Sequence, residues 1–172
     1  MWLFKALAIR LISLSFFISG CGFQPLYEHD TTSHNILKEL SLIRIAAIED
    51  RIGQQLRNFL QDDITPRGKP TNPSYELIVK INKTRRDLVL LQDATSTFAK
   101  ISLHASYTLT NFTSGGTLAS GNVTAKTGFT ITQSEYANIS AETKATSRAS
   151  REISYDIARQ LALFLKQTTS NN

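Results

Sequence analysis

Cysteine and histidine are scarce in this chain of 172 residues, which has one cysteine and three histidines. A single thiol cannot form an internal disulfide, so we expect the hydrophobic core alone to stabilise the folded part. The histidines, His29, His34 and His104, follow neither the HxH nor the HExxH spacing that zinc sites use. We therefore predict no metal site.

Motifs of the common hydrolases are also missing, since no GxSxG sequence occurs. His104 is flanked by serines on the polar side of an expected strand, where a solvated histidine is more usual than a Ser–His catalytic pair. The acidic pairs at 49–50 and 62–63 are adjacent in the chain, and adjacent residues of a helix do not face each other. We predict that the protein is not an enzyme.

Blocks of basic residues are absent too. Residues 1–20 contain two basic residues and no acidic one, so the other 152 residues have 17 basic and 14 acidic residues, a net charge of +3. An excess this small, without a Lys/Arg cluster, does not indicate a nucleic-acid partner.

The first 20 residues have the three parts of a secretory signal peptide. Lys5 and Arg10 supply positive charge, residues 11–18 are apolar, and the small residues Ser19 and Gly20 follow. The uninterrupted apolar part is shorter than the roughly 20 residues of a membrane-spanning helix. A signal peptide is thus favoured over a retained transmembrane anchor.

The only cysteine, Cys21, follows this segment directly, and residues 18–21 (ISGC) resemble a bacterial lipobox. The lipobox implies that Cys21 becomes the first mature residue, with a diacylglycerol on its sulfur and an N-acyl chain on its amino group. Each buried methylene contributes about 0.8 kcal/mol, so two or three chains should anchor the protein essentially permanently. We predict lipidation at Cys21 and no other cofactor.

Behind the cysteine we expect three further segments. Residues 21–36 are the lipidated N-terminus and a polar tether, residues 37–168 form a single α+β domain, and residues 169–172 are a frayed tail. A chain of this length can bury a proper core.

The apolar pattern predicts the elements of that domain. Residues 40–48 favour a strand. A helix follows, with Ile52, Leu56, Phe59 and Leu60 on one face and Asp50 as its cap, although Gly53 costs it roughly 1 kcal/mol against alanine. Strands are expected from residue 75, over 97–112 and over 117–129, with a polar kink at 82–87.

The chain closes on a long helical pattern from Ser134, with an apolar residue at every fourth position: Ala141, Ala145, Ala149, Ile153, Ile157, Leu161 and Leu165. The predicted order is β-α-β-β-β-α. We expect an α+β fold in which two helices pack on one face of a four-stranded, mostly antiparallel sheet.

Two surfaces are candidates for binding. Lys83, Arg85 and Arg86 in the expected kink could contact phosphates, although a solvated turn explains them as well. The alternate positions of strand 97–112, from Lys100 to Thr110, form a face rich in serine and threonine and poor in charge. Such a face suits either another polar protein surface or plain solvent.

Residues 21–27, CGFQPLY, resemble the mature start of the LPS-assembly lipoprotein family LptE, particularly its alphaproteobacterial branch. Looser similarities lie at residues 52–56 (IGQQL), 75–77 (YEL), 105–109 (ASYTL) and 151–165 (REISYDIARQLALFL).

The resemblance implies a lipoprotein on the periplasmic side of the outer membrane. Members of the family sit inside the β-barrel LptD, help to assemble it, and complete lipopolysaccharide export with it. They are also described as binding lipopolysaccharide through basic residues. No motif aligns those residues here, so Lys83, Arg85 and Arg86 are candidates from their charge alone.

Two other functions fit the same sequence. One is an accessory lipoprotein of an ABC-type lipid transport system, which would have an inner-membrane transporter as its partner. The other is a lipid-tethered periplasmic hydrolase, whose turnover would depend on His104.

Overall fold

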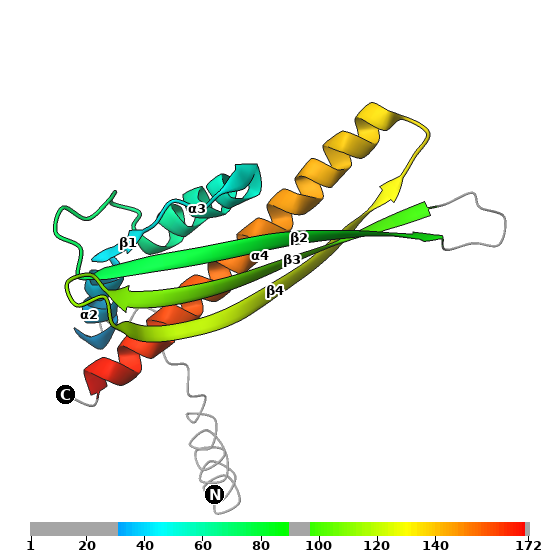
Figure 1. The fold of residues 1–172 in the computed structure, drawn as a ribbon. Helices are drawn as coiled ribbons and strands as arrows, with labels where there is room; N and C mark the ends of the chain where they lie inside the picture. The colour runs from blue at the N-terminus through cyan, green and yellow to red at the C-terminus, as the bar shows by residue number, and fades with distance from the viewer. Residues whose placement is uncertain (1–30, 90–96, 171–172) are drawn as a thin grey trace, which may run out of the picture. The chain divides into compact units, whose positions relative to one another are not determined.

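The computed structural model describes residues 31–89 and 97–170, and Cys21, the signal peptide and residues 21–30 of the expected tether lie outside these ranges. Seven elements follow one another along the chain (Figure 1). They are α2 (Thr31–Leu40), β1 (Ile43–Ile45), α3 (Asp50–Ile64), β2 (Tyr75–Val89), β3 (Thr97–Asn111), β4 (Thr117–Ile131) and α4 (Glu135–Ser170). None of the described helices has the length and apolar character needed to cross a membrane.

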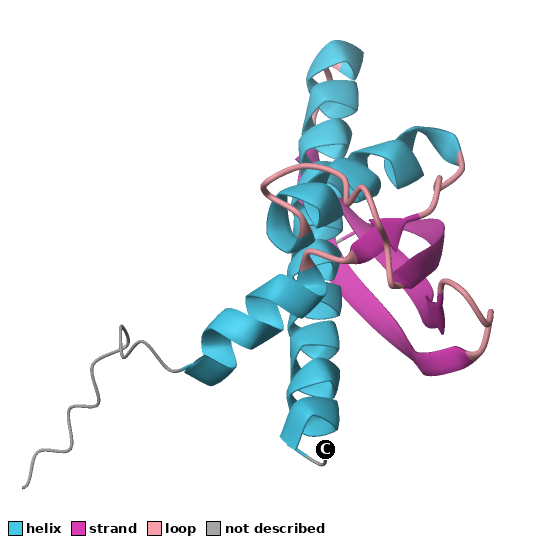
Figure 2. Cartoon of the chain, turned by 90° about the vertical axis from the view of Figure 1, so that its left-hand side faces the viewer, coloured by secondary structure: helices cyan, strands magenta, loops and turns pink. Residues whose placement is uncertain are grey.

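The four strands form one sheet in the order β1-β2-β3-β4. β1 is parallel to β2, as expected for strands joined through a helix, and the other neighbours are antiparallel. β2 and β3 pair residue for residue from Tyr75↔Asn111 to Val89↔Thr97. The predicted α+β class and the β-α-β-β-β-α order are confirmed, and Figure 2 shows the helices gathered to one side of the strands.

The core lies between the sheet and α4. Six alternate residues of β3, the predicted apolar face, are buried: Ala99, Ile101, Leu103, Ala105, Tyr107 and Leu109. The predicted stripe of α4 is buried from Ala145 through Ala149, Ile153, Ile157 and Leu161 to Leu165. We call the side of the sheet that faces these helices the inner face and the opposite side the outer face.

Helix α3 packs through Gly53, Leu56, Leu60 and Ile64, so the predicted apolar face is displaced by about one residue towards Gly53. A Cβ on Gly53 would lie 2.5 Å from Cγ2 of Ile48, which explains why glycine is present despite its low helix propensity. The predicted cap is wrong, because Asp50 is the first helical residue and Glu49, at the cap position, makes no side-chain hydrogen bond.

Helix α2 is not predicted from the sequence, where residues 31–36 are expected to belong to the tether and residue 40 to begin the first strand. Tyr75 Oη donates a hydrogen bond to Glu39 Oε2 at 3.0 Å, which connects α2 to the start of β2. Burial raises the pKa of Tyr75, so this phenol remains a donor at neutral pH. The first strand is correspondingly shorter than predicted, with three residues, Ile43–Ile45. At the other end, α4 continues to Ser170, two residues into the predicted tail.

The predicted kink at residues 82–87 is also wrong, because β2 continues through it and pairs with β3 without interruption. The polar residues reflect exposure and not a break in the strand. Along the inner face, Leu77 and Val79 are buried, whereas the side chains of Lys83, Arg85 and Asp87 are 26%, 40% and 50% exposed. We call this end, where β2 ends and β3 begins, the distal end of the sheet.

Candidate functional site

The three predicted cations lie on one strand but not on one face. Side chains alternate along a strand, so Lys83 and Arg85 project from the inner face and Arg86 from the outer face. The structure therefore brings together only two of the three residues, and it gives the third different neighbours.

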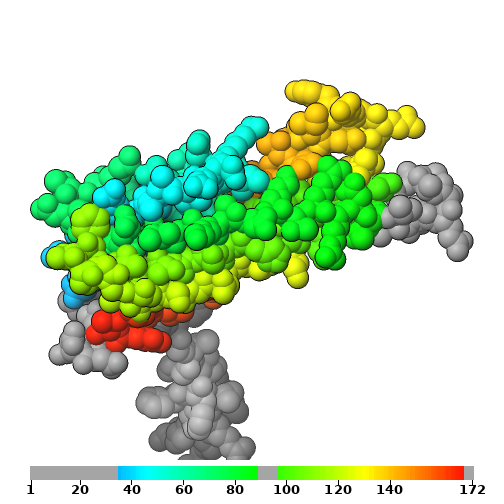
Figure 3. All heavy atoms as spheres, in the orientation of Figure 1, coloured from blue at the N-terminus to red at the C-terminus, as the bar shows by residue number. Residues whose placement is uncertain are grey.

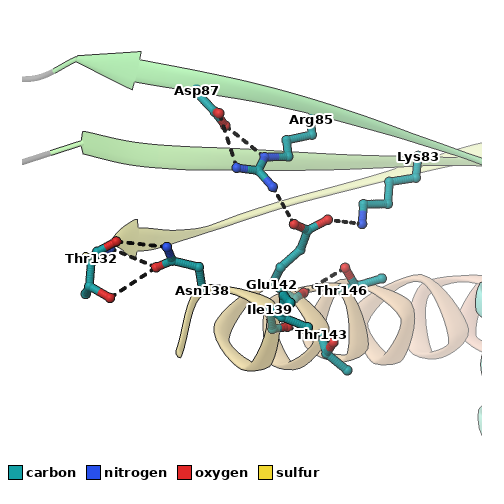
Figure 4. Close-up of polar contacts among 9 residues, drawn as sticks. All are labelled: Lys83, Arg85, Asp87, Thr132, Asn138, Ile139, Glu142, Thr143 and Thr146. Carbon is teal, nitrogen blue, oxygen red and sulfur yellow. Dashed lines mark hydrogen bonds and ion pairs between the residues drawn. The ribbon is translucent and has the colours of Figure 1, made fainter. Parts of the chain in front are cut away.

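On the inner face, Lys83 and Arg85 converge on Glu142 of α4 (Figure 4). Lys83 Nζ lies 2.5 Å from Glu142 Oε1, and Arg85 Nη1 lies 2.5 Å from Glu142 Oε2. Arg85 also donates from Nε and Nη2 to the two carboxylate oxygens of Asp87, at 2.9 and 3.1 Å. We call Lys83, Arg85, Asp87 and Glu142 the Glu142 clasp, because they connect β2 to α4.

The clasp contains two positive and two negative side chains, so its formal charge is zero when all four are ionised. The hydrogen bond from Lys83 lowers the pKa of Glu142, and the hydrogen bond from Arg85 lowers the pKa of Asp87. The hydrogen bond to Asp87 likewise raises the pKa of Arg85. Each shift favours the charged form of its group, so Glu142, Asp87 and Arg85 are ionised at neutral pH.

The start of α4 is held in place where it carries Glu142. Ala137 N donates to Ser134 Oγ at 3.4 Å, so Ser134, where the predicted helical pattern begins, caps the helix. Asn138 exchanges two hydrogen bonds of 2.8 Å with the backbone of Thr132, just after β4 (Figure 4). Since Asn138 lies one turn before Glu142, these bonds position the carboxylate above the distal end of the sheet.

A hollow of about 310 Å³ opens beside the clasp, between β2 and the N-terminal halves of α3 and α4. Its lining includes two cations, Arg51 and Lys83, and two apolar side chains, Ile52 and Ile139, together with Gln55, Glu142, Thr143 and Thr146. Arg51 is exposed and forms no ion pair with any residue that the structure describes. The hollow thus combines positive charge with an apolar wall.

The outer face is different, because its cations other than Arg44 form no ion pair with a described residue. Arg86 lies directly opposite Lys100 of β3, and Lys126 of β4 lies opposite Ser102. Together with Lys80 of β2, these residues form what we call the outer basic face: Lys80, Arg86, Lys100 and Lys126. None of the four forms an ion pair with a described residue. Figure 3 views the molecule from this side, where β2, β3 and β4 form the surface.

A single acidic residue, Glu76, lies on the outer face of the described strands. It forms an ion pair with Arg44, in which Glu76 Oε1 lies 3.7 Å from Arg44 Nε. Like charges directly opposite each other on neighbouring strands destabilise a sheet. The Arg86–Lys100 pair is therefore unfavourable for folding alone, and an anion bound between the two side chains would relieve the repulsion.

The hydroxyl-rich face predicted on β3 is present and continues onto β4 through the cross-strand partners Ser120, Asn122 and Thr124. His104 is exposed, and its Nδ1 lies 3.0 Å from Thr124 Oγ1, within hydrogen-bonding distance. Within the described ranges, no group of three or more His, Cys, Asp or Glu residues could hold a metal ion.

Sequence reasoning missed Glu142, Asp87, Lys126 and the importance of Lys100. Nothing near Glu142 in the sequence identifies it, because its partners are 57 and 59 residues away. Lys100 and Lys126 could have been found by combining the period-two pattern with the correct pairing of the three long strands.

Solved structures share this fold. A lipoprotein of Caulobacter crescentus matches with a TM-score of 0.64 and 24% identity, over 77% of this chain and 96% of that chain. A homologue of the neuraminyllactose-binding hemagglutinin from Helicobacter pylori matches with a TM-score of 0.51 and 14% identity, over 76% of this chain and 86% of that chain. No curated protein matches the sequence.

The family described as "LptE: Lipopolysaccharide-assembly" matches residues 37–162, which include every described strand and most of α4. Proteins of this family are non-enzymatic lipoproteins, and membership implies a role in lipopolysaccharide assembly together with LptD. The prediction that the protein is not an enzyme is confirmed on this basis. Because the match covers most of the sequence, the chain belongs to the LptE family.

Proposed function

We propose that this protein is an outer-membrane lipoprotein that acts as the plug and assembly partner of an LptD β-barrel in lipopolysaccharide export. The family match over residues 37–162 carries this proposal. The CGFQPLY sequence and the lipobox before it support an anchor at Cys21, on the periplasmic side of the outer membrane.

The outer face supports a position inside a water-filled barrel. Its strands present serine, threonine and asparagine side chains, with few acidic groups and few large apolar ones. Such a surface stays hydrated and can still form hydrogen bonds with polar side chains of a barrel wall.

We further propose that the protein binds lipopolysaccharide directly through phosphate groups. The candidates Lys83, Arg85 and Arg86 differ in their availability, because Glu142 and Asp87 occupy the first two. Arg86 is exposed beside Lys100, and an Arg fork next to a Lys point charge suits a phosphate group. The outer basic face is therefore the primary site of the proposal.

The role is tested by capturing the C-terminally tagged protein from membranes solubilised in mild detergent. A large β-barrel protein in near-stoichiometric amount is the expected result. Recovery with inner-membrane transporter subunits would instead favour the accessory lipoprotein of an ABC-type system. A Cys21→Ser variant should lose acylation, as seen by mass spectrometry of the intact protein.

Lipopolysaccharide binding is tested separately with the purified full chain and purified lipopolysaccharide. Charge reversal of Arg86 and Lys100 together should weaken binding at least tenfold, since two charge-assisted contacts are lost and two repulsions are introduced. The matched control reverses Arg67 and Lys144, which are exposed and belong to a loop and to α4, not to the strands. Equal loss in both double variants would show that only net charge matters and would overturn the site.

A further inference from the structure

We propose that Glu142 occupies a second phosphate site on the inner face, formed by Lys83 and Arg85, and that this site binds a phosphate monoester when the Glu142 carboxylate leaves. The expectation of a phosphorylated lipid rests on the proposed function. The carboxylate and its two cations are features of the chain itself.

The geometry of the clasp is that of an occupied anion site. Lys83 and Arg85 project from the same face of β2 and donate to the two different oxygens of the Glu142 carboxylate. The donor nitrogen lies 2.5 Å from the acceptor oxygen in both hydrogen bonds. A phosphate monoester offers three equivalent acceptor oxygens and about twice the negative charge. It can therefore accept the same two hydrogen bonds.

The Arg85 side chain remains positioned without Glu142. Asp87 accepts two hydrogen bonds from one edge of its guanidinium group, and the guanidinium carbon lies 5.6 Å from the centre of the Phe129 ring. These contacts direct Nη1 towards the place where the Glu142 carboxylate lies. The Arg85 donor is thus held in position by residues that a ligand would not displace.

Glu142 can leave without disturbing the core. Its side chain is 23% exposed at the edge of the hollow, and a rotation about its side-chain bonds moves the carboxylate away from β2. Its replacement by a phosphate monoester would exchange one negative charge for nearly two, and the exposed Arg51 at the rim offers a further positive charge. Ile52 and Ile139 supply a wall for an apolar part of the ligand.

The test is isothermal titration calorimetry of the full lipidated chain in detergent, in a phosphate-free buffer. The probe is dihexanoyl phosphatidic acid, a soluble lipid with a phosphate monoester, and inorganic phosphate is titrated in parallel. Glu142→Gln should bind the lipid about tenfold more tightly than the unmodified chain, because the competing internal anion is gone. The gain should disappear in Glu142→Gln/Arg85→Gln.

Glu152→Gln is the matched control, since it removes the same charge from an exposed position of α4. It should leave the affinity unchanged. A thermal melt confirms that each variant is folded. Glu142→Asp is a second variant, which retains the negative charge on a shorter side chain. Its affinity for the lipid should lie between those of the unmodified chain and Glu142→Gln. Comparable gains with inorganic phosphate and lipid would assign the site to phosphate itself, whereas a gain with lipid alone would add the apolar wall to the site.

Equal affinity of Glu142→Gln and the unmodified chain would overturn the inference and leave Glu142 as a structural contact. That result would not affect the outer basic face, which is tested by Arg86 and Lys100. Conversely, tighter binding in Glu142→Gln together with unchanged lipopolysaccharide binding in the Arg86/Lys100 reversal would support the inner site and overturn the outer one.

Discussion

Neighbouring cations of β2 have different electrostatic surroundings on the two faces of the sheet. On the inner face, Lys83 and Arg85 form ion pairs with Glu142 and Asp87, and the Glu142 clasp has no net charge. On the outer face, Arg86 lies opposite another cation, Lys100, and forms no ion pair with a described residue. The basic residues of β2 are therefore divided between two surfaces with different electrostatics. Among them, only Arg86 on the outer face offers an unpaired charge to a ligand.

The two faces also differ in what they contribute to stability. The inner face is apolar over most of its length, and the charged residues of its described strands lie at the distal end, where the clasp connects β2 to α4. The outer face contributes hydrogen-bonding side chains to the surface and little to the core. Four predictions test this difference, in order of decreasing effect.

The largest difference is expected between adjacent residues of β3. Leu103→Ala removes a fully buried side chain of the inner face and should lower the free energy of unfolding by about 2–5 kcal/mol. Ser102→Ala, on the outer face, should change it by less than about 0.5 kcal/mol. Urea denaturation followed by circular dichroism measures both, and similar losses in the two variants would contradict the assignment of the faces.

The clasp should contribute less to the free energy of unfolding than a core residue does, but more than any outer-face cation. Lys83→Gln breaks a charge-assisted hydrogen bond to Glu142, and we expect a loss of about 1 kcal/mol at low salt. Arg86→Gln, three residues further along the strand, should not destabilise the protein, because it only removes the repulsion from Lys100. A destabilised Arg86→Gln would show that this residue has a structural partner.

The contribution of the clasp should depend on pH with a definite sign. The pKa of Glu142 is lowered in the folded state, mainly by the hydrogen bond from Lys83, so its ionisation stabilises the fold above the pKa of the unfolded chain. That stability is lost as the pH falls through the lower folded pKa. The difference in unfolding free energy between the unmodified chain and Glu142→Gln should thus be constant near pH 7 and shrink below about pH 4. A difference that grows on acidification would contradict the assignment.

The smallest effect is expected from relief of the repulsion across the outer face. Lys100→Gln should stabilise the protein by a few tenths of a kcal/mol, because Arg86 then lies opposite a neutral side chain. High salt should abolish the gain by screening the charges. The control is Lys144→Gln on α4, which is exposed and should be neutral.

The elements that the sequence predicted well are those with a long, regular pattern. β3 alternates strictly over its length, and α4 repeats an apolar residue at every fourth position, so each has one apolar side, and that side is buried. α2 and the short β1 were mispredicted because their placement depends on tertiary contacts, such as the Tyr75–Glu39 hydrogen bond. The kink at residues 82–87 was predicted from polarity, which here reflects exposure at the end of a strand.

The candidate site was only partly predictable for a related reason. Charge alone identified Lys83, Arg85 and Arg86, but their roles depend on which side of β2 each occupies and on what lies opposite. Glu142 comes from a different element, and only the packing of α4 on the sheet brings it to β2. A sequence shows which charges exist, whereas their neutralisation is a property of the fold.

The short β1 has a consequence for solubility. It pairs with Tyr75–Leu77 alone, so among the described residues no strand covers the same edge of β2 from Ile78 to Val89. An open edge of this length is a template on which another chain could add a strand and begin to aggregate. Five charged side chains, Lys80, Lys83, Arg85, Arg86 and Asp87, extend from both faces of that edge and oppose such pairing. Three of these side chains, Lys83, Arg85 and Arg86, are also the predicted candidates for ligand binding, so the same charges should also oppose self-association.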